Sequence, residues 1–341
     1  MAAGEAAPRV GVAGATGYAG AELVGLLLEH PSVQLTQVSS RRQAGRRHRE
    51  VCRGSNCELE LKAELDPGQL EVVISALPAL EAAAQAPAWL AGGAILIDVS
   101  ADFRLREPGL YLTWYGREHP APELLSPAAL TLPELGLGSP GGRVVALPGC
   151  FATAAIIAAG PAVRSGLVEL DVVVDGKTGI SGAGRGAGPD YLFSELGESV
   201  LAYAVPGHRH QPEIVQALSD LAEGRVGVTF VPHLVPMTRG IAVTCYLRWA
   251  GPPQLERVVQ EYRLAYAGSP FIHLVDSPAP TKLASRTNHT FVHLASQGPH
   301  LVVEAVLDNL GRGAAWQAVQ ALNWRLGLDL AAGIGRAPQW P

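Results

Sequence analysis

Cysteine is scarce in this sequence, in which Cys52, Cys57, Cys150 and Cys245 are the only four among 341 residues. Their scattered spacing fits neither a disulfide framework nor a zinc site, which predicts reduced thiols and a cytoplasmic location. Long apolar runs are also missing, because the longest, 151–159, is far too short to cross a bilayer. The N-terminus lacks the charged-then-apolar pattern of a signal peptide. We therefore expect a soluble protein without a membrane partner.

Charged residues are few as well, at 17% of the chain, with a net charge of -5. This balance argues against a nucleic-acid partner but permits local basic pockets for an anionic ligand. Hydrophobic residues make up 48% of the chain, which also holds 39 glycines and 26 prolines. Such a composition at this length is typical of a compact, loop-rich α/β protein with two domains.

A glycine-rich turn links a predicted strand near the N-terminus to a predicted helix. The segment 9–20 combines a short apolar run with glycines, and 21–28 shows the apolar pattern of an amphipathic helix. Glycines let the backbone approach a pyrophosphate, and a helix N-terminus neutralises its charge. The pattern predicts the opening of a dinucleotide-binding βαβ unit.

A second strand is predicted over 34–40, which ends in Ser39 and Ser40 and is followed directly by Arg41 and Arg42. NAD enzymes commonly place a carboxylate here for the ribose hydroxyls, whereas the 2′-phosphate of NADP needs cations and small donors. These residues therefore favour NADP. The alternative is a solvated basic loop that continues through the arginines that follow.

Two further apolar strands, 72–77 and 94–100, flank an alanine-rich helix at 80–90. Such alternation indicates a parallel sheet covered on both faces, whose ligands bind beyond the carboxyl ends of the strands. Asp102 and Arg104 follow the second of these strands. They belong either to a site or to an ion pair within the loop, and for Asp102 we favour the structural role.

Cys150 stands where a strand turns into a helix. The apolar run 143–146 precedes it, and an Ala/Ile-rich helical segment, 154–159, follows. The N–H groups and the positive dipole end of a helix start lower the pKa of a thiol and favour the nucleophilic thiolate. Cys150 is a candidate nucleophile, with a small core residue as the alternative.

Two polar segments follow Cys150. The loop 176–186 is rich in glycine and hydroxyl groups and contains Arg185, which suits a carboxylate or phosphate, with a plain linker as the alternative. His208 and His210 stand just before a helix that begins near Pro212. We favour acid/base work over zinc binding for the histidines, because no third ligand stands at suitable spacing.

The remaining segments predict a second, largely antiparallel sheet. Its strands are expected at 170–175, 226–231, 241–249 and 301–307, with a helix at 254–267. A turn at 308–313 precedes a last helix at 314–326. That turn either brings an amide toward the cofactor or is an ordinary helix cap.

Taken together, these segments resemble a known family over nearly the full chain. The motifs that carry the resemblance are 11–20, 39–41, 99–105, 132–135, 148–150, 181–185, 208–214 and 303–310. In order and spacing they are similar to the N-acetyl-gamma-glutamyl-phosphate reductases of arginine biosynthesis, relatives of aspartate-semialdehyde dehydrogenase and, more distantly, of glyceraldehyde-phosphate dehydrogenase. Two positions depart from the family pattern: Leu147 replaces the usual asparagine, and Phe151-Ala152 replaces Tyr-Pro.

The resemblance implies an α/β protein with a Rossmann NADP-binding domain and an α+β catalytic domain like that of glyceraldehyde-phosphate dehydrogenase. It places the NADP-binding domain at 1–149, with a C-terminal helix at 312–341 packing back on it. The catalytic and oligomerisation domain is then 150–311. A homodimer or homotetramer is implied as well.

The implied reaction is reduction of N-acetyl-gamma-glutamyl phosphate by NADPH, through a thioester on Cys150, to the semialdehyde and phosphate. His208, slightly favoured, or His210 is the acid/base, and no metal is expected. Glu213 either orients a histidine or binds the acetamido nitrogen. The residues implied to bind NADP(H) are Gly11, Gly14, Ala15, Thr16, Gly17, Tyr18, Ser39, Ser40, Arg41 and Asn309. Those implied to bind substrate are Arg104, Ser181, Gly182, Arg185, Arg209 and Glu213.

Two rival functions stay open on the sequence. One is reduction of an aminoadipate phosphate attached to a carrier protein in lysine biosynthesis, which calls for a basic entrance that this acidic chain does not obviously supply. The other is a cofactor-binding regulator that has lost catalysis, for which Leu147 is the only hint. Cys150 and the paired histidines weigh against the regulator.

Overall fold

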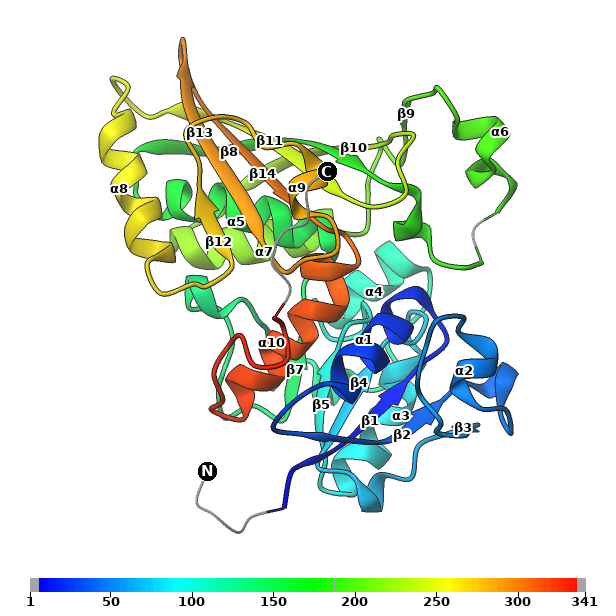
Figure 1. Ribbon diagram of the computed structural model, residues 1–341. Helices are drawn as coiled ribbons and strands as arrows, with labels where there is room; N and C mark the ends of the chain where they lie inside the picture. The colour runs from blue at the N-terminus through cyan, green and yellow to red at the C-terminus, as the bar shows by residue number, and fades with distance from the viewer. Residues whose placement is uncertain (1–5, 187, 336–341) are drawn as a thin grey trace. The chain divides into compact units, whose positions relative to one another are not determined.

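The computed structural model describes residues 6–186 and 188–335 (Figure 1). Its contacts divide the chain into two compact units. The first unit runs through Thr131 and adds Gly138–Leu147 and Ala314–Gly335, and the second contains Leu132–Leu137 and Pro148–Gly313. Within the described residues, no helix is long and apolar enough to cross a membrane.

The first unit is built on a seven-stranded sheet in which every neighbouring pair is parallel. In spatial order its strands are β3 (Leu61–Lys62), β2 (Gln34–Ser39), β1 (Arg9–Ala13), β4 (Val72–Ser75), β5 (Ile95–Asp98), β7 (Val144–Ala146) and β6 (Ala129–Leu130). Strand order reverses direction between β1 and β4, as it does in dinucleotide-binding folds. The expected Rossmann architecture is confirmed.

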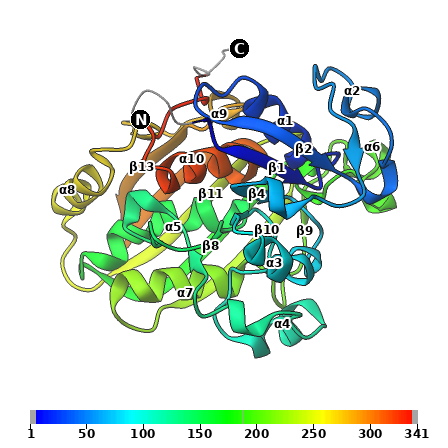
Figure 2. The same cartoon turned by 90° about the horizontal axis from the view of Figure 1, so that it is seen from below.

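Helices cover both faces of this sheet. They are α1 (Tyr18–Leu28), α3 (Glu81–Ala91), α4 (Pro108–Tyr115) and α10 (Trp316–Arg325), and the short α2 (His48–Val51) lies beside the edge strand β3 (Figure 1). Figure 2 shows α1 and α10 together on one side of the strands and α3 on the other. The last helix ends at Arg325 and does not continue toward 341, because Gly327 takes a left-handed φ of 67° that breaks the helix. Residues 336–341 lie outside the described residues.

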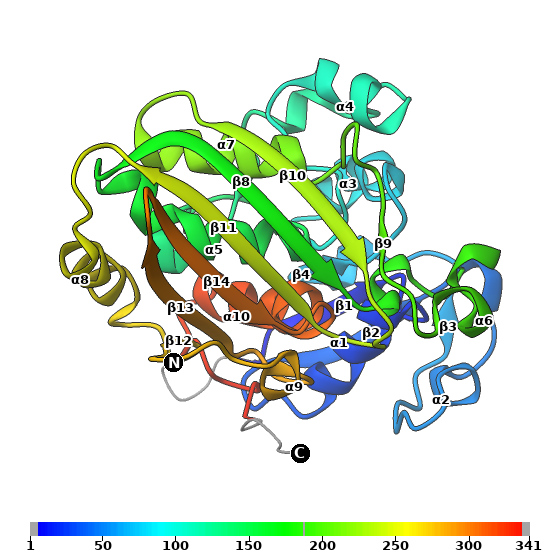
Figure 3. The same cartoon turned by 90° about the horizontal axis from the view of Figure 1, so that it is seen from above.

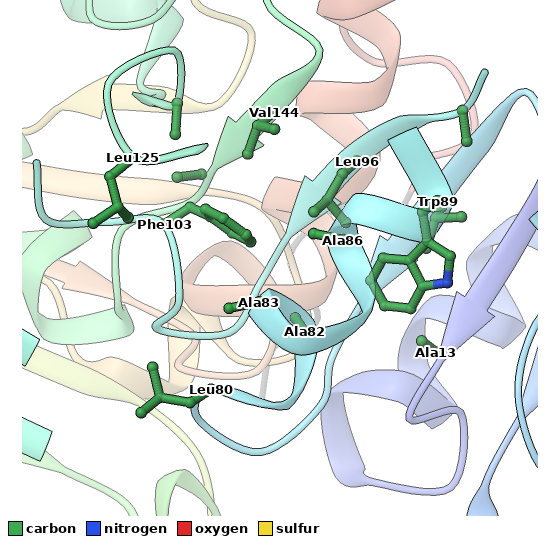
Figure 4. Close-up of a cluster of buried hydrophobic side chains, with 14 of the residues drawn as sticks. Ala13, Leu80, Ala82, Ala83, Ala86, Trp89, Leu96, Phe103, Leu125 and Val144 are labelled. Atoms are coloured by element: carbon green, nitrogen blue, oxygen red, sulfur yellow. The ribbon is translucent and has the colours of Figure 1, made fainter. Parts of the chain in front are cut away.

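One core of the first unit lies under α3 (Figure 4). Trp89 of α3, Leu96 of β5 and Phe103 are all buried there. The adjacent Asp102 is fully buried, and its carboxylate accepts hydrogen bonds from the N–H groups of Leu80 (2.6 Å) and Ala83 (2.8 Å). Asp102 therefore holds the start of α3, which is a structural role.

The second unit contains a mixed seven-stranded sheet. In spatial order its strands are β12 (Ile272–Leu274), β13 (Thr290–Gln297), β14 (His300–Leu307), β11 (Ile241–Trp249), β8 (Val168–Thr178), β10 (Gly227–Leu234) and β9 (Leu201–Ala202). Four neighbouring pairs are antiparallel, and β10–β8 and β12–β13 are parallel. The expected largely antiparallel sheet is confirmed.

Three long helices pack on one face of this sheet, namely α5 (Cys150–Arg164), α7 (Gln211–Ala222) and α8 (Leu255–Tyr266). The short α6 (Phe193–Leu196) lies in the loop before β9. The opposite face is turned to the viewer in Figure 3. Of the helices described in this unit, only the short α9 (Thr281–Ala284) lies there, packed against Phe291 and Val306. No other helix described in the second unit covers that face.

The central helix of the second unit is α5, which is buried from Phe151 to Val163. Pro161 lies inside this helix and has no N–H, so the carbonyl of Ile157 loses its helical donor. The hydroxyl of Tyr266 donates to that carbonyl at 2.6 Å. The neighbouring Tyr262 hydroxyl donates to the carbonyl of Ala158. Tyr266 therefore satisfies the carbonyl that Pro161 leaves without a helical donor, and both tyrosines tie α8 to α5.

Candidate active site

Cys150 is the first residue of α5. The preceding Gly149 is the N-cap, with extended backbone (φ -63°, ψ 159°), and the first turn of the helix carries no acidic side chain. The thiol is partly exposed, whereas Cys52, Cys57 and Cys245 are buried. The predicted position of Cys150 at a helix N-terminus is confirmed.

A buried carboxylate holds the turn that presents Cys150. Glu213, in the first turn of α7, is fully buried, and its Oε2 accepts the N–H of Gly149 at 2.8 Å. The bond joins residues 64 positions apart and ties α7 to the start of α5. Glu213 therefore acts on the backbone beside the nucleophile, a role that the sequence motifs did not indicate.

Both candidate histidines pack against the residue that follows Cys150. The ring of Phe151 meets His208 edge-on at 6.0 Å between centroids and His210 at 6.4 Å. The two imidazoles lie 4.7 Å apart at nearly right angles. The structure therefore places His208 and His210 against Phe151, the residue that follows Cys150, at the junction of α5 and α7.

His208 has a defined protonation state. Its Nδ1 accepts the backbone N–H of His210 at 3.0 Å, so in the neutral ring the proton is carried by Nε2. Burial is the main cause that lowers the pKa of His208, and the nearby His210 lowers it further, to about 3. The carboxylate of Glu213 opposes this shift. His208 is a neutral Nε2–H donor across the range of pH in which enzymes commonly work.

The segment between β14 and α10 touches Cys150 directly. Gly311–Ala315 forms a π-helical turn, a geometry that occurs frequently at functional sites. A Cβ added at Gly313 would lie 2.6 Å from the Cβ of Cys150, which is closer than real Cβ contacts come. Only glycine fits there. Nothing in the sequence pattern distinguished Gly313 from the other glycines.

Asp308 anchors that π-helical turn. Its buried carboxylate accepts the N–H groups of Leu310 (2.9 Å) and Gly311 (2.8 Å), and the guanidinium Nε of Arg239 at 2.9 Å. The N–H of Gly313 in turn donates to the carbonyl of Asp308 at 2.8 Å. The charged pair is almost fully desolvated, so removing either partner leaves a buried, uncompensated charge.

The predicted ligand-binding residues of the second unit fall into two groups. Asn309 and Ser181 are buried and bonded to each other, with Asn309 Nδ2 donating to Ser181 Oγ at 3.0 Å and Asn309 Oδ1 accepting the N–H of Gly240 at 2.8 Å. Gly182, Arg185 and Arg209 are exposed. Asn309 therefore fixes the loop that carries Ser181.

The glycine turn of the first unit has the geometry expected of an anion-binding helix start. Gly14 takes a left-handed φ of 78°, and a Cβ there would lie 2.6 Å from the carbonyl oxygen of Ala76. Gly17 is the N-cap of α1, and neither a capping side chain nor an acidic residue occupies the first turn, which begins at Tyr18. The turn therefore fits a pyrophosphate. Gly11 lies apart from it, inside β1, paired with Gln37 and Val73.

The end of β2 adjoins this turn. Ser39 is buried, and its carbonyl accepts the N–H of Ala15 at 3.0 Å. Ser40 Oγ and Thr16 Oγ1 are 2.9 Å apart. Arg41 forms an exposed ion pair with Glu64 at 2.9 Å, which is weak in solvent and can be exchanged for a phosphate.

Arg104 also belongs to the first unit. It is buried, and its guanidinium donates to the carbonyl of Val99 at 2.8 Å. This bond fixes the loop after β5, the same loop from which Asp102 holds α3.

Comparison with known proteins places the chain in a family. A domain described as "Semialdehyde dehydrogenase, NAD binding domain" matches residues 9–138, and "Semialdehyde dehydrogenase, dimerisation domain" matches residues 150–309. The N-acetyl-gamma-glutamyl-phosphate reductase of Dehalococcoides mccartyi is 43% identical over 331 residues, covering 96% of this chain and 97% of its own. This chain belongs to the N-acetyl-gamma-glutamyl-phosphate reductase family. The protein of the same name from Halorhodospira halophila is 42% identical, covering 95% of this chain and 97% of its own.

Solved structures bear out the fold of this family member. Aspartate semialdehyde dehydrogenase II of Vibrio cholerae, complexed with ASA, matches with a TM-score of 0.73 at 18% identity, over 95% of this chain and 99% of that one. The aspartate semialdehyde dehydrogenase of Candida albicans, solved with NADP, matches with a TM-score of 0.69 at 16% identity, over 96% and 99%. At these identities the likeness concerns the fold alone, and the expected two-domain α/β fold is confirmed.

Proposed function

We propose that this chain reduces N-acetyl-gamma-glutamyl phosphate to the semialdehyde with NADPH. The observation that carries the proposal is the thiol of Cys150 at the start of a buried helix, with two histidines on the adjacent Phe151 ring and a backbone held by Glu213. A thiol, an acid/base and an oriented backbone are what acyl transfer to cysteine requires.

The reaction divides into two steps at Cys150. The thiolate attacks the acyl carbon, the carbon–oxygen bond to phosphate breaks, and phosphate leaves with the electron pair, which gives a thioester. NADPH, when bound, supplies the hydride that reduces this thioester. The resulting alkoxide needs a hydrogen-bond donor until it collapses to the aldehyde and expels the thiolate.

We assign different roles to the two histidines. His208 carries its proton on Nε2 and stays neutral, so it serves as a hydrogen-bond donor to the developing alkoxide, in the manner of an oxyanion hole. That leaves His210 to exchange a proton with the thiol. This assignment differs from the prediction made from the sequence, which slightly favoured His208 as the acid/base.

Matched glutamine variants test the assignment. His210→Gln is expected to lower kcat about 100-fold or more, because the general base is lost. His208→Gln keeps an N–H donor near the position of Nε2 and is expected to cost less than about tenfold. A larger loss in His208→Gln would contradict the assignment.

The first unit is proposed to bind NADPH through the glycine turn and the end of β2. We propose that this domain ends near residue 149 and that α10, from the end of the chain, belongs to it as well. Arg41 is the proposed partner of the 2′-phosphate. Arg41→Ala is expected to lower the NADPH to NADH ratio of kcat/KM by about tenfold, since one charge-assisted contact is lost. Arg46→Ala, an exposed arginine of the same segment, is the control. An unchanged ratio in Arg41→Ala, or equal use of NADH by the wild type, would refute the preference.

For the substrate anion we propose Arg185 and Arg209, two exposed residues of the second unit, with Ser181 and Gly182 supplying donors. Arg104 is a further candidate, from the first unit. A carboxylate or phosphate bound by arginine receives two parallel hydrogen bonds, which orients it as well as holds it.

An assay in the reverse direction tests the function. Reduction of NADP⁺ is followed by absorbance with N-acetylglutamate semialdehyde and phosphate, and with aspartate semialdehyde and phosphate in parallel. We expect turnover with the first substrate only. Preference for a carrier-linked aminoadipate semialdehyde would support the rival substrate, and NADPH binding without turnover on any of them would support a regulator.

We propose that two copies of this chain meet through the face of the second sheet that lacks helical cover. Val173 and Tyr246, paired across β8 and β11, are 42% and 37% exposed there, beside the row of Asp175 and Thr244. Exposed apolar side chains of this kind on an open sheet face lose contact with water when a second copy packs against them. Light scattering is expected to give a dimer or tetramer of the 35.7 kDa chain, and Tyr246→Glu a lower mass. A monomeric wild type would contradict this proposal. We also propose a cytoplasmic location, because scattered cysteine thiols are typical of a reducing compartment.

A further inference from the structure

His48 is a buried histidine within an otherwise exposed basic segment. It is the first residue of α2, in the stretch of arginines that follows β2, and its side chain is completely inaccessible to solvent. Arg47 and Arg49 on either side are exposed and pair with Glu58. His48 therefore points into the first unit while its neighbours point out.

Both ring nitrogens of His48 have partners that settle the tautomer. Nε2 lies 3.0 Å from the carbonyl oxygen of Ala15, which can only accept, so Nε2 carries the proton. Nδ1 lies 2.9 Å from Ser55 Oγ and accepts its hydroxyl proton, while that oxygen accepts the N–H of Cys57 at 3.2 Å. Burial lowers the pKa of His48, so the neutral ring is the working form.

The acceptor, Ala15, lies in the glycine turn. Its N–H is held by the carbonyl of Ser39 at 3.0 Å, and its carbonyl is held by His48. A trans peptide is planar, with C=O and N–H pointing in opposite directions. Because the Ala15 carbonyl points at His48, the N–H of Thr16, which shares that peptide plane, points away from it.

We propose that His48 is a positioning residue for the cofactor, which fixes the Ala15–Thr16 peptide so that the turn offers an N–H and not a carbonyl oxygen to a bound pyrophosphate. If this peptide flipped, an oxygen with partial negative charge would face the phosphates in place of a donor. The inference rests on the proposed binding of NADPH by the glycine turn. It links the basic segment after β2 to that turn through one hydrogen bond.

A pair of variants separates positioning from packing. His48→Leu keeps a buried side chain of similar bulk but removes the Nε2–H donor to the Ala15 carbonyl. The Kd for NADPH is expected to rise about tenfold or more, because the N–H of Thr16 is then no longer oriented toward the pyrophosphate. His48→Gln places an amide N–H near the position of Nε2 and is expected to restore most of the affinity. The Kd for NADPH of each purified variant is measured by direct titration, followed by the fluorescence of NADPH.

The steady-state constants supply the second readout. With saturating NADPH, kcat and the KM for the acyl phosphate in His48→Leu are expected to equal those of the wild type, whereas the KM for NADPH rises. Thermal unfolding of both variants identifies any general loss of structure. If His48→Leu binds NADPH as tightly as the wild type, or if a folded His48→Gln binds as weakly as His48→Leu, the proposal is wrong. If the wild type itself binds no NADPH, the proposed function fails first.

Discussion

Cys150→Ala is expected to abolish turnover, with kcat reduced by about four orders of magnitude or more, because the covalent route has no other nucleophile. Alanine is a good helix former and removes only the sulfur, so α5 and its packing are expected to persist. The partly exposed thiol lies at the site, not in the core, and its loss leaves no large cavity. NADPH binding is expected to remain unchanged, since the glycine turn belongs to the first unit.

Cys245→Ala is the matched control for this substitution. Cys245 lies in β11, fully buried, and burial raises the pKa of its thiol to about 12, so it is no nucleophile. That variant is expected to lose stability but keep its kcat. Steady-state assays compare kcat of Cys150→Ala and Cys245→Ala with that of the wild type, and NADPH titrations compare their Kd values. Residual activity above a few per cent in Cys150→Ala would contradict the thioester route.

Much of this architecture could be predicted because its signals are local in the sequence. The run from 9 to 28 contains a strand, a turn and a helix in sequence order, so spacing and glycine placement sufficed to predict β1, the turn and α1. Cys150 was recognisable for the same reason, since its strand and helix adjoin it directly. The predicted bounds of β11 agree with the structure to the residue.

What escaped prediction depends on contacts between distant segments. Glu213 reaches Gly149 across 64 positions, and His48 reaches Ala15 across 33. No periodicity or spacing reveals such a bond, because it is set by how separate elements pack. His48 in particular stands among exposed arginines, so its surroundings in the sequence indicated a solvated loop and concealed a buried side chain.

Gly313 belongs to the same class, and it leads to the second large effect that we expect. The residue is more than 160 positions from Cys150, yet the two backbones touch, because Asp308 gathers the N–H groups that shape the π-helical turn. The position of the nucleophile thus depends on how closely that turn can approach α5. A glycine at 313 permits this approach, and every other residue prevents it.

Gly313→Ala is therefore expected to lower kcat about 100-fold, because a displacement of the nucleophile by about 1 Å is enough for such a loss. The new Cβ would lie 2.6 Å from the Cβ and 3.2 Å from the Cα of Cys150, and neither of these atoms can rotate away. Overpacking of this kind costs about 1–3 kcal/mol of stability, so the folded protein is expected to survive for measurement. The defect falls on the thiol, and the Kd for NADPH is expected to stay as in the wild type.

Gly251→Ala serves as the comparison, since an added Cβ there meets no atom within 4 Å. It is expected to match the wild type in kcat and in thermal stability. The rate of alkylation of Cys150 by iodoacetamide, together with kcat, distinguishes a displaced thiol from a general loss of structure, which circular dichroism would register. A folded Gly313→Ala with wild-type kcat would mean that the helix start and the π-helical turn can separate without harm. In that case the close approach at Gly313 would not set the position of the nucleophile.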